Sequence, residues 1–154
     1  MKIRPARPDE IGVLTALCMR SKQSNGYDDA FMAACREELT VTQADLAVGE
    51  YWVAEAVAEA DAVCGCACLL AEPNARSGEI HAFFIDPEQK RQGIGRLLWQ
   101  KLLERAQDRQ LVELYLDADP NAVPFYQDLG FVVVGSKPSG SIPGREIPHM
   151  RITL

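Results

Sequence analysis

The sequence lacks any long apolar segment. Although 47% of its 154 residues are hydrophobic, no run reaches the roughly 18 to 20 apolar residues that a membrane-spanning helix needs. The first ten residues, MKIRPARPDE, are polar where a secretory signal peptide would turn apolar. We therefore expect neither secretion nor a membrane partner, and we predict a cytoplasmic location.

The chain has only two histidines, and it has an odd number of cysteines, five. An odd number without a secretory signal is typical of reduced thiols rather than of a disulfide framework. Cys64, Cys66 and Cys68 follow C-x-C-x-C spacing, and neither His81 nor His149 completes the second ligand pair of a usual zinc site. We predict no metal site. We interpret AVCGCACLL as a buried strand whose alternate residues share one face and whose cysteines act as small hydrophobes.

An excess of positive charge is also missing, because the formal net charge is −6. A nucleic-acid-binding protein usually carries a basic face that neutralises phosphates, so we expect no nucleic-acid partner. The acidic balance is compatible with a cationic partner such as an amine, although acidic surfaces mostly serve solubility. The length and the absence of linkers or repeats predict a single domain over residues 1–154.

Hydrophobic periodicity and turn residues predict an α/β (α+β) domain built on one mixed sheet. We expect Asn121 to be the N-cap of its helix, with Pro124 in the first turn, and Gly130 to end that helix. The predicted elements are a strand over 1–4, a helix after Pro8, a helix over 28–39, strands over 51–57 and 62–70 joined at 58–61, a loop over 72–78, a strand over 79–86, a helix over 93–108, a strand over 111–118, a helix over 121–129, and strands over 131–135 and 145–154.

One stretch, DPEQKRQGIGRLL over residues 86–98, brings basic residues and two glycines together in an otherwise acidic chain. The first turn of a helix leaves backbone N–H groups unpaired and carries partial positive charge. Gly93 and Gly95 let an anion approach this backbone without meeting a Cβ atom, and basic side chains stand beside them. Alternatively, Gly93 only eases a turn and the basic side chains are solvated. The spacing fits neither a P-loop nor a dinucleotide fingerprint, which would need glycine in place of Leu98.

These residues resemble the central motif of the GNAT superfamily of N-acetyltransferases, which bind acetyl-coenzyme A. The family pattern Q/R-x-x-G-x-G/A falls on Lys90, Gly93 and Gly95, with lysine in place of the usual Gln or Arg. A second segment, DADPNAVPFYQDLGFVVVG, is similar to the family's N-x-x-A-x-x-F-Y-x-x-x-G-F segment, loosely at the small residue and closely at Phe125-Tyr126. The ending PSGSIPGREIPHM resembles that of small bacterial members. The resemblance is firm from Glu79 to the C-terminus.

The resemblance implies the GNAT fold: a single mixed, largely antiparallel sheet with splayed central parallel strands and about four helices. The pantetheine arm of acetyl-CoA would lie between the strands over 79–86 and 111–118. Backbone groups of Phe84 and Ile85 would bind that arm, and backbone N–H groups of the glycine-containing turn would hold the pyrophosphate. The residues implied for the turn are Lys90, Arg91, Gln92, Gly93, Ile94, Gly95 and Arg96.

The implied activity is transfer of the acetyl group from acetyl-CoA, without a metal, to a primary amine of an unidentified acceptor that attacks the thioester directly. Tyr126 would act as the acid beside the leaving sulfur, unless it is simply a core aromatic, and Asn121 would contact the pantetheine. Glu79, fourteen residues before Gly93, or His81 on the same strand face would take the proton from the amine.

Asp117 is a third candidate base. Because family members often pair through sheet edges, the resemblance allows a homodimer. The alternatives are a non-catalytic acetyl-CoA-binding sensor or interaction module, and a generic nucleotide-binding domain.

Overall fold

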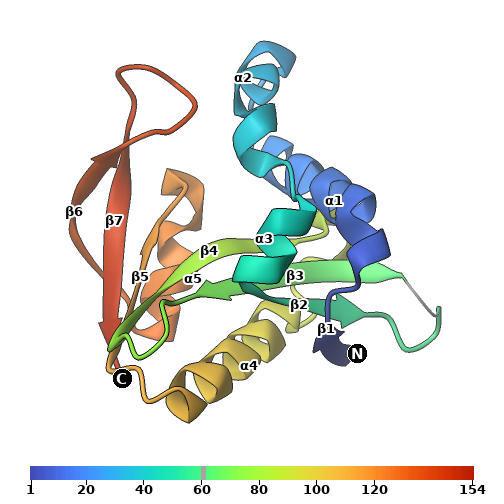
Figure 1. The fold of residues 1–154 in the computed structure, drawn as a ribbon. Coiled ribbons are helices and arrows are strands. Elements are labelled where there is room, and N and C mark those ends of the chain that lie inside the picture. Colours follow the sequence, from blue (N-terminus) through green and yellow to red (C-terminus); the bar gives the residue numbers. More distant parts are fainter. Residues whose placement is uncertain (60–61) are drawn as a thin grey trace.

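The computed structural model describes residues 1–59 and 62–154, which form a seven-stranded sheet covered by helices (Figure 1). The strand order is β1-β2-β3-β4-β5-β7-β6, and of the described pairs only β4 and β5 are parallel. This confirms the predicted mixed, largely antiparallel sheet. The strands are β1 (Lys2–Pro5), β2 (Glu50–Glu55), β3 (Val63–Leu70), β4 (Ser77–Ile85), β5 (Glu113–Asp117), β6 (Val132–Pro138) and β7 (Glu146–Thr153). The helices are α1 (Ile11–Gln23), α2 (Asp29–Leu39), α3 (Gln43–Val48), α4 (Ile94–Asp108) and α5 (Val123–Leu129).

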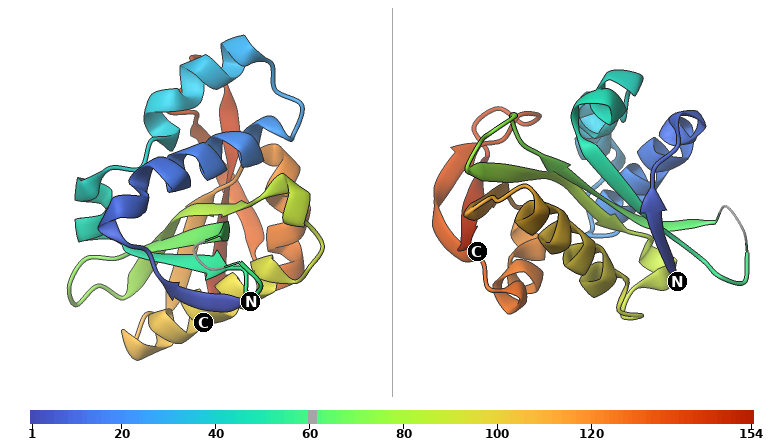
Figure 2. Two further views of the ribbon diagram at one scale, coloured as in Figure 1. Left: turned by 90° about the vertical axis from the view of Figure 1, so that its right-hand side faces the viewer. Right: turned by 60° about the horizontal axis from the view of Figure 1, so that its bottom comes forward.

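The helices form two layers, one on each face of the sheet. Helices α1, α2 and α3 lie on one face, and α4 and α5 lie on the other (Figures 1 and 2). The side chains that fill the two interfaces form two separate apolar clusters. The α1-side cluster includes Leu14, Leu17, Cys18, Val53 and Cys66. The α4-side cluster includes Leu98, Leu102, Leu114, Phe131 and Met150.

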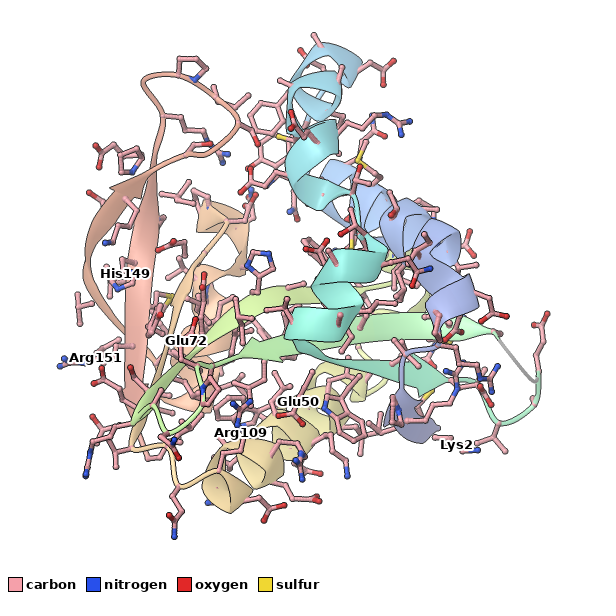
Figure 3. The ribbon with its side chains drawn as sticks, viewed as in Figure 1. Lys2, Glu50, Glu72, Arg109, His149 and Arg151 are labelled. Atoms are coloured by element: carbon pink, nitrogen blue, oxygen red, sulfur yellow. The ribbon has the colours of Figure 1, made fainter. Side chains whose placement is uncertain are left out.

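Helix α4 is fixed firmly beneath the sheet. Its buried residues recur at helical spacing and form one apolar stripe: Ile94, Leu98, Trp99, Leu102 and Ala106. At its C-terminal end, Glu50 of β2 accepts hydrogen bonds from Arg105 Nε at 2.8 Å and from Arg109 Nη1 at 3.1 Å (Figure 3). The predicted helix over 93–108 is confirmed, and these contacts fix where its N-terminus lies.

Strands β4 and β5 separate soon after they begin. They pair in parallel only at Ser77–Glu113, Gly78–Leu114 and Glu79–Tyr115, and the two ribbons then diverge (Figure 1). The divergence follows a break in the β3–β4 register, where Cys68 faces Ala82 but Leu69 faces Ile80, which leaves His81 as an extra residue. Such bulges bend a strand and often lie beside active sites. The predicted splay is confirmed.

Several local predictions were wrong. Helix α3 was not predicted, and the described chain therefore has five α-helices rather than about four. Its start is a capping box, in which Thr42 Oγ1 accepts from the Asp45 amide at 3.1 Å and Asp45 Oδ2 accepts from the Thr42 amide at 2.9 Å. Ser77 and Gly78 belong to β4 rather than to the predicted loop.

The start of α5 also differs from the prediction. Asn121 is not its N-cap, because it lies inside a short 3-10 turn (Pro120–Ala122) that precedes the helix. Asp119 caps that turn, since its Oδ1 accepts from the Asn121 amide at 2.9 Å. Pro124 does lie in the first turn, and Gly130, with φ of 108°, ends the helix as predicted.

The predicted buried strand of cysteines is confirmed, but the three thiols do not share a face. A register break between Ala54 and Glu55 of β2, whose partners are Gly65 and Val63, interrupts the alternation. Cys64 therefore packs on the α4 side, whereas Cys66 and Cys68 pack on the α1 side. The predicted hairpin connection over 58–61 lies partly outside the described residues.

Within the described ranges, no helix combines the length and apolarity needed to cross a membrane.

Candidate functional site

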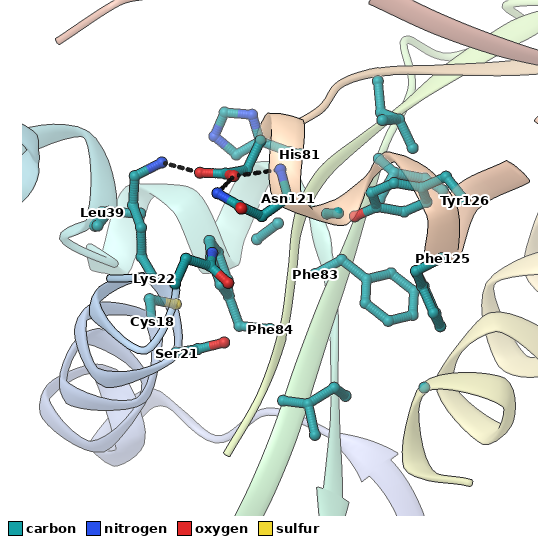
Figure 4. A pocket seen from close by; sticks show the side chains of 18 of the residues that line it. Cys18, Ser21, Lys22, Leu39, His81, Phe83, Phe84, Asn121, Phe125 and Tyr126 are labelled. Carbon is teal, nitrogen blue, oxygen red and sulfur yellow. Dashed lines mark hydrogen bonds and ion pairs between the residues drawn. The ribbon is translucent and has the colours of Figure 1, made fainter. Parts of the chain in front are cut away.

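A pocket of about 610 Å³ occupies the wedge where β4 and β5 part. Its walls come from α1, α2, β4, the N-terminus of α4, the end of β5, the start of α5 and the β6–β7 loop (Figure 4). Most of the predicted site residues line it: His81, Phe84, Ile85, Lys90, Arg91, Gly93, Ile94, Gly95, Arg96, Asn121 and Tyr126. Glu79 and Gln92 are not among its lining residues. The fold thus brings together predicted residues that lie between positions 81 and 126 of the sequence.

The N-terminus of α4 opens into this pocket. Gly93 is the N-cap, and no side chain there accepts a hydrogen bond from the first turn. Its φ is 78°, and Arg91, two residues earlier, is also left-handed with φ of 67°. Unpaired N–H groups and the partial positive charge of a helix start bind anions. The side chains of Lys90, Arg91 and Arg96 add positive charge to the same wall.

The two glycines are needed for different reasons. A Cβ atom at Gly93 would meet no atom within 4 Å, so the positive φ, rather than crowding inside the protein, is what favours glycine there. A Cβ atom at Gly95 would lie 2.9 Å from Cε1 of Phe125. The glycine at residue 95 is therefore explained by close packing of α4 against α5. The positive φ of Gly93 agrees with the alternative that this glycine eases a turn.

The backbone of β4 offers hydrogen-bonding groups to the wedge. The Asp86 amide donates to the Cys64 carbonyl at 2.8 Å, toward β3. Peptide groups of an antiparallel pair alternate in direction, so those of Phe84 also face β3, whereas those of Phe83 and Ile85 face the wedge. The predicted backbone role of Ile85 fits this geometry. The predicted backbone role of Phe84 does not fit this geometry, because its peptide groups face β3 and those of Phe83 face the wedge.

Tyr126 of α5 is a packed aromatic residue whose hydroxyl group reaches the pocket. Its ring packs edge-on against Phe83, Phe125 and Phe131, with centroids 5.3 to 6.1 Å apart, and the residue is only 7% exposed. Its hydroxyl group points into the pocket (Figure 4) and has no hydrogen-bond partner among the described residues. Burial, with the charge of Asp119 as a smaller cause, raises the pKa of Tyr126. The hydroxyl group is therefore protonated at neutral pH.

His81 and Glu79 lie on the same face of β4, as expected. His81 Nδ1 is 3.9 Å from Glu79 Oε1, and of the two only His81 lines the pocket. The Glu79 carboxylate raises the pKa of His81 above its usual value of 6.5, burial opposes this, and the charges of Asp45 and Glu38 add to it. The imidazole is thus a pocket-facing base made stronger by carboxylates around it.

A polar network that the sequence did not predict crosses the pocket mouth. Asp119 Oδ2 accepts from Lys22 Nζ at 3.3 Å and from the Tyr27 hydroxyl at 2.8 Å. Arg145 Nη2 donates to the Tyr27 hydroxyl at 2.7 Å. Asn121 Nδ2 donates to Asp119 Oδ1 at 2.9 Å, and Figure 4 shows the Lys22 and Asn121 interactions as dashed lines. These residues come from three stretches of the sequence, 22–27, 119–121 and 145, and only Asp119 and Asn121 are connected by a local pattern.

Three further carboxylates line the pocket. Asp117 is a predicted candidate base, and its Oδ1 accepts a hydrogen bond from His149 Nδ1, 2.7 Å away. Glu38 and Asp45 lie on the α2 and α3 side. Within the described parts of the chain, no group of three His, Cys, Asp or Glu side chains is placed to hold a metal ion.

Comparison with known proteins assigns this chain to a family. The profile described as "Acetyltransferase (GNAT) domain" matches residues 43–154. The chain therefore belongs to the GNAT acetyltransferase family, as the sequence motifs indicated.

Relatives and solved structures agree with this assignment. GCN5-related N-acetyltransferase 2, chloroplastic, of Arabidopsis thaliana is 39% identical over 64 residues, which are 37% of this chain and 25% of that protein. The chain spans about a quarter to two-fifths of the length of the curated relatives it matches. A GCN5-related N-acetyltransferase from Rhodopseudomonas palustris has a TM-score of 0.79 at 21% identity, covering 99% of this chain and 95% of that chain.

A second solved structure is similar over the whole chain. The PaiA N-acetyltransferase of Thermoplasma acidophilum, solved with coenzyme A, has a TM-score of 0.75 at 17% identity and covers 99% of this chain and 98% of that chain. At these identities the structural likeness establishes the fold, so the chemistry has to be argued from the residues themselves.

We predict that Gly95→Ala destabilises the protein by about 1–3 kcal/mol, the usual range for overpacking, although alanine favours helices. The added methyl group would displace the Phe125 ring. Urea unfolding measures the effect. The matched control is Gly12→Ala in α1, where a Cβ atom meets nothing within 4 Å, and there we expect a small gain in stability. Equal effects of the two substitutions would contradict the packing argument.

Proposed function

We propose that this protein transfers an acetyl group from acetyl-CoA to a primary amine. One observation carries the proposal: the wedge between β4 and β5 and the uncapped N-terminus of α4 open into a single pocket. A long molecule with a diphosphate at one end and a thioester at the other suits such a pocket. The family membership and the coenzyme A bound to the Thermoplasma acidophilum structure support this choice.

The chain's own groups suit acetyl-CoA. The amides from Arg91 to Arg96 would hold the diphosphate, and the nearby basic side chains would add charge. The peptide groups of Phe83 and Ile85 would bind the pantetheine arm as an added strand. Asn121 would present its side-chain oxygen to an amide of that arm, because its Nδ2 is already held by Asp119.

The amine must lose a proton before its nitrogen can attack the thioester carbon. A lysine-like amine with a pKa of about 10.4 is uncharged in only about one molecule in a thousand near pH 7.4. His81 would accept this proton, since it lines the pocket and Glu79 strengthens it as a base. Glu79 would act through His81, 3.9 Å away. Asp117 is the second candidate base because it also lines the pocket.

The attack forms a tetrahedral intermediate, and its collapse breaks the carbon–sulfur bond and expels the thiolate of coenzyme A. The Phe83 amide, which faces the wedge, would donate to the oxyanion. Tyr126 would donate a hydrogen bond to the sulfur. Proton transfer from a phenol of pKa 10 or more to a thiolate of pKa about 8.5 costs about 2 kcal/mol or more. Tyr126 therefore stabilises the developing charge, and solvent completes protonation of the thiolate.

Thiol release tests the proposed function directly. Purified protein with acetyl-CoA and a panel of primary amines should release free thiol only when an amine is present. Calorimetry should show coenzyme A binding that Gly93→Val weakens by about 100-fold or more, because the side chain crowds the diphosphate and opposes the positive φ. Gly12→Val is the matched control, with no atom within 4 Å of its Cβ atom.

Gly93→Asn separates crowding from strain, because asparagine tolerates left-handed backbone. We expect it to weaken coenzyme A binding while the protein stays folded. Undiminished affinity in both variants would contradict the diphosphate assignment. Binding without amine-dependent thiol release would favour a non-catalytic acetyl-CoA-binding module.

For Tyr126→Phe we predict a kcat lower by about 10- to 100-fold, with the KM for acetyl-CoA within about 3-fold of the wild type. The ring keeps its packing against Phe83 and Phe131, so only the hydroxyl group is lost. Steady-state kinetics with thiol detection measures both constants. An unchanged kcat would show that the hydroxyl group plays no part at the sulfur.

The pH dependence of kcat/KM should report the base. We expect activity to rise with pH through the pKa of His81, which lies above 6.5. Glu79→Gln removes the largest cause of the raised pKa of His81, so the rise of kcat/KM should occur at lower pH. His81→Asn should abolish it. If kcat/KM of His81→Asn still rises over the same pH range, the base is another group.

A further inference from the structure

Charge is distributed unevenly along the pocket. Lys90, Arg91 and Arg96 line it at the N-terminus of α4, whereas Glu38 and Asp45 line it on the α2 and α3 side. The two carboxylates form no ion pair with any residue that the structure describes. The pocket therefore has a basic end and an acidic end.

The acidic end has anions that the protein itself does not neutralise. Glu38 Oε2 accepts from the Ser141 hydroxyl, and Asp45 Oδ2 accepts from the Thr42 amide at 2.9 Å. The other oxygen of each carboxylate accepts no hydrogen bond from a described residue. By contrast, Asp119 is paired with Lys22 at 3.3 Å. Glu38 is exposed and Asp45 is half-buried, so water can solvate both carboxylates, and their negative charge attracts a cation that enters the pocket.

A second observation indicates that a ligand belongs in this cavity. The Tyr126 side chain is more than nine-tenths buried and points its hydroxyl group, without a partner among the described residues, into the same pocket (Figure 4). The Tyr126 hydroxyl oxygen itself is open to the pocket, because Trp52 Nε1 is the one fully buried side-chain polar atom without a partner among the described residues. A bound molecule can therefore reach this hydroxyl group, and the proposed function gives that place to the sulfur of acetyl-CoA.

The walls beside the acidic end are apolar. Most of them belong to, or pack against, the buried cluster on the α1 side of the sheet. The apolar lining residues there are Cys18, Cys35, Leu39, Val41 and Tyr51. A ligand rich in hydroxyl groups would leave them unpaired against this wall, which costs about 1–3 kcal/mol for each group. An apolar body, in contrast, gains stability from the contact.

The β6–β7 loop limits the size of the ligand. Ser141 donates to Glu38 of α2, and Arg145 donates to Tyr27 and lies 5.0 Å from the ring centroid of Phe31. The loop thus reaches across to the α1–α2 segment on the opposite wall (Figure 1). The pocket of about 610 Å³ must also admit the pantetheine arm. The space that remains suits a small molecule better than a protein surface.

We propose that the acceptor is a small monoamine with an apolar body, whose ammonium group is held by Glu38 and Asp45 and whose body packs against the Cys18, Leu39 and Val41 wall. This inference rests on the proposed acetyl transfer and specifies the acceptor that the acidic end selects. The class excludes amino acids, whose carboxylate would meet Glu38, and polyhydroxylated amino sugars.

Initial rates with matched amines test the inference. We expect kcat/KM for 2-phenylethylamine to exceed that for phenylalanine, 1,4-diaminobutane, glucosamine and a lysine-containing peptide by at least about tenfold. Phenylalanine differs from 2-phenylethylamine only by the added carboxylate, so this pair isolates charge. Glucosamine and 1,4-diaminobutane lack the apolar body, so their lower kcat/KM measures what that body contributes. Equal or better activity with any of the four would overturn the inference while leaving acetyl transfer intact.

A variant pair tests the role of the carboxylate. Glu38→Gln should raise the KM for 2-phenylethylamine about tenfold and leave the KM for acetyl-CoA unchanged. Glu37→Gln is the matched control, because Glu37 is exposed on the same helix and does not line the pocket. Equal effects of the two substitutions would overturn the assignment of Glu38.

Calorimetric titration of 2-phenylethylamine into the protein–coenzyme A complex separates this inference from the proposed function. Binding that Glu38→Gln weakens would support the inference even if no amine released thiol, which would refute only the acetyl transfer. No binding of 2-phenylethylamine to a complex that does bind coenzyme A would overturn the inference.

Discussion

The parallel pairing of β4 and β5 ends after three residue pairs, and the site depends on this constraint. Parallel neighbours usually run together along their length, so an early separation leaves peptide groups without partners. The bulge at His81 bends β4 away where pairing stops, and it places the imidazole at the opening. Backbone groups, candidate base and pocket thus share one physical origin. Sheet geometry, more than any single side chain, makes the site.

The second determinant is electrostatic. The basic N-terminus of α4 suits a diphosphate, and the unpaired carboxylates of α2 and α3 suit an ammonium group. The net charge of −6 does not reveal these two ends, because it says nothing about where the charged residues lie in the pocket. The network around Asp119 ties the β6–β7 loop to α1 and its following turn. One cavity can therefore receive an anion and a cation.

Patterns local in sequence were predictable. The apolar stripe of α4 and the helix stop at Gly130 depend on neighbours within a few residues, and both are confirmed. What depends on register was not predictable. Alternation misplaced Cys64, because the bulge is set by the partner strand. The resemblance implied that the Phe84 backbone faces the wedge, whereas the ladder with β3 turns its peptide groups toward β3. The approach of Arg145 to Tyr27 joins residues 118 positions apart, and no local spacing encodes it. The capping box of α3 is a local pattern, Thr42 followed three residues later by Asp45, and it could have been predicted.

The most direct test is a crystal structure of the protein with coenzyme A. We predict the diphosphate on the amides from Arg91 to Arg96 and the pantetheine arm between β4 and β5, bonded to the peptide groups of Phe83 and Ile85. Coenzyme A bound at another surface, or a wedge filled by the protein's own side chains in that crystal, would contradict the account.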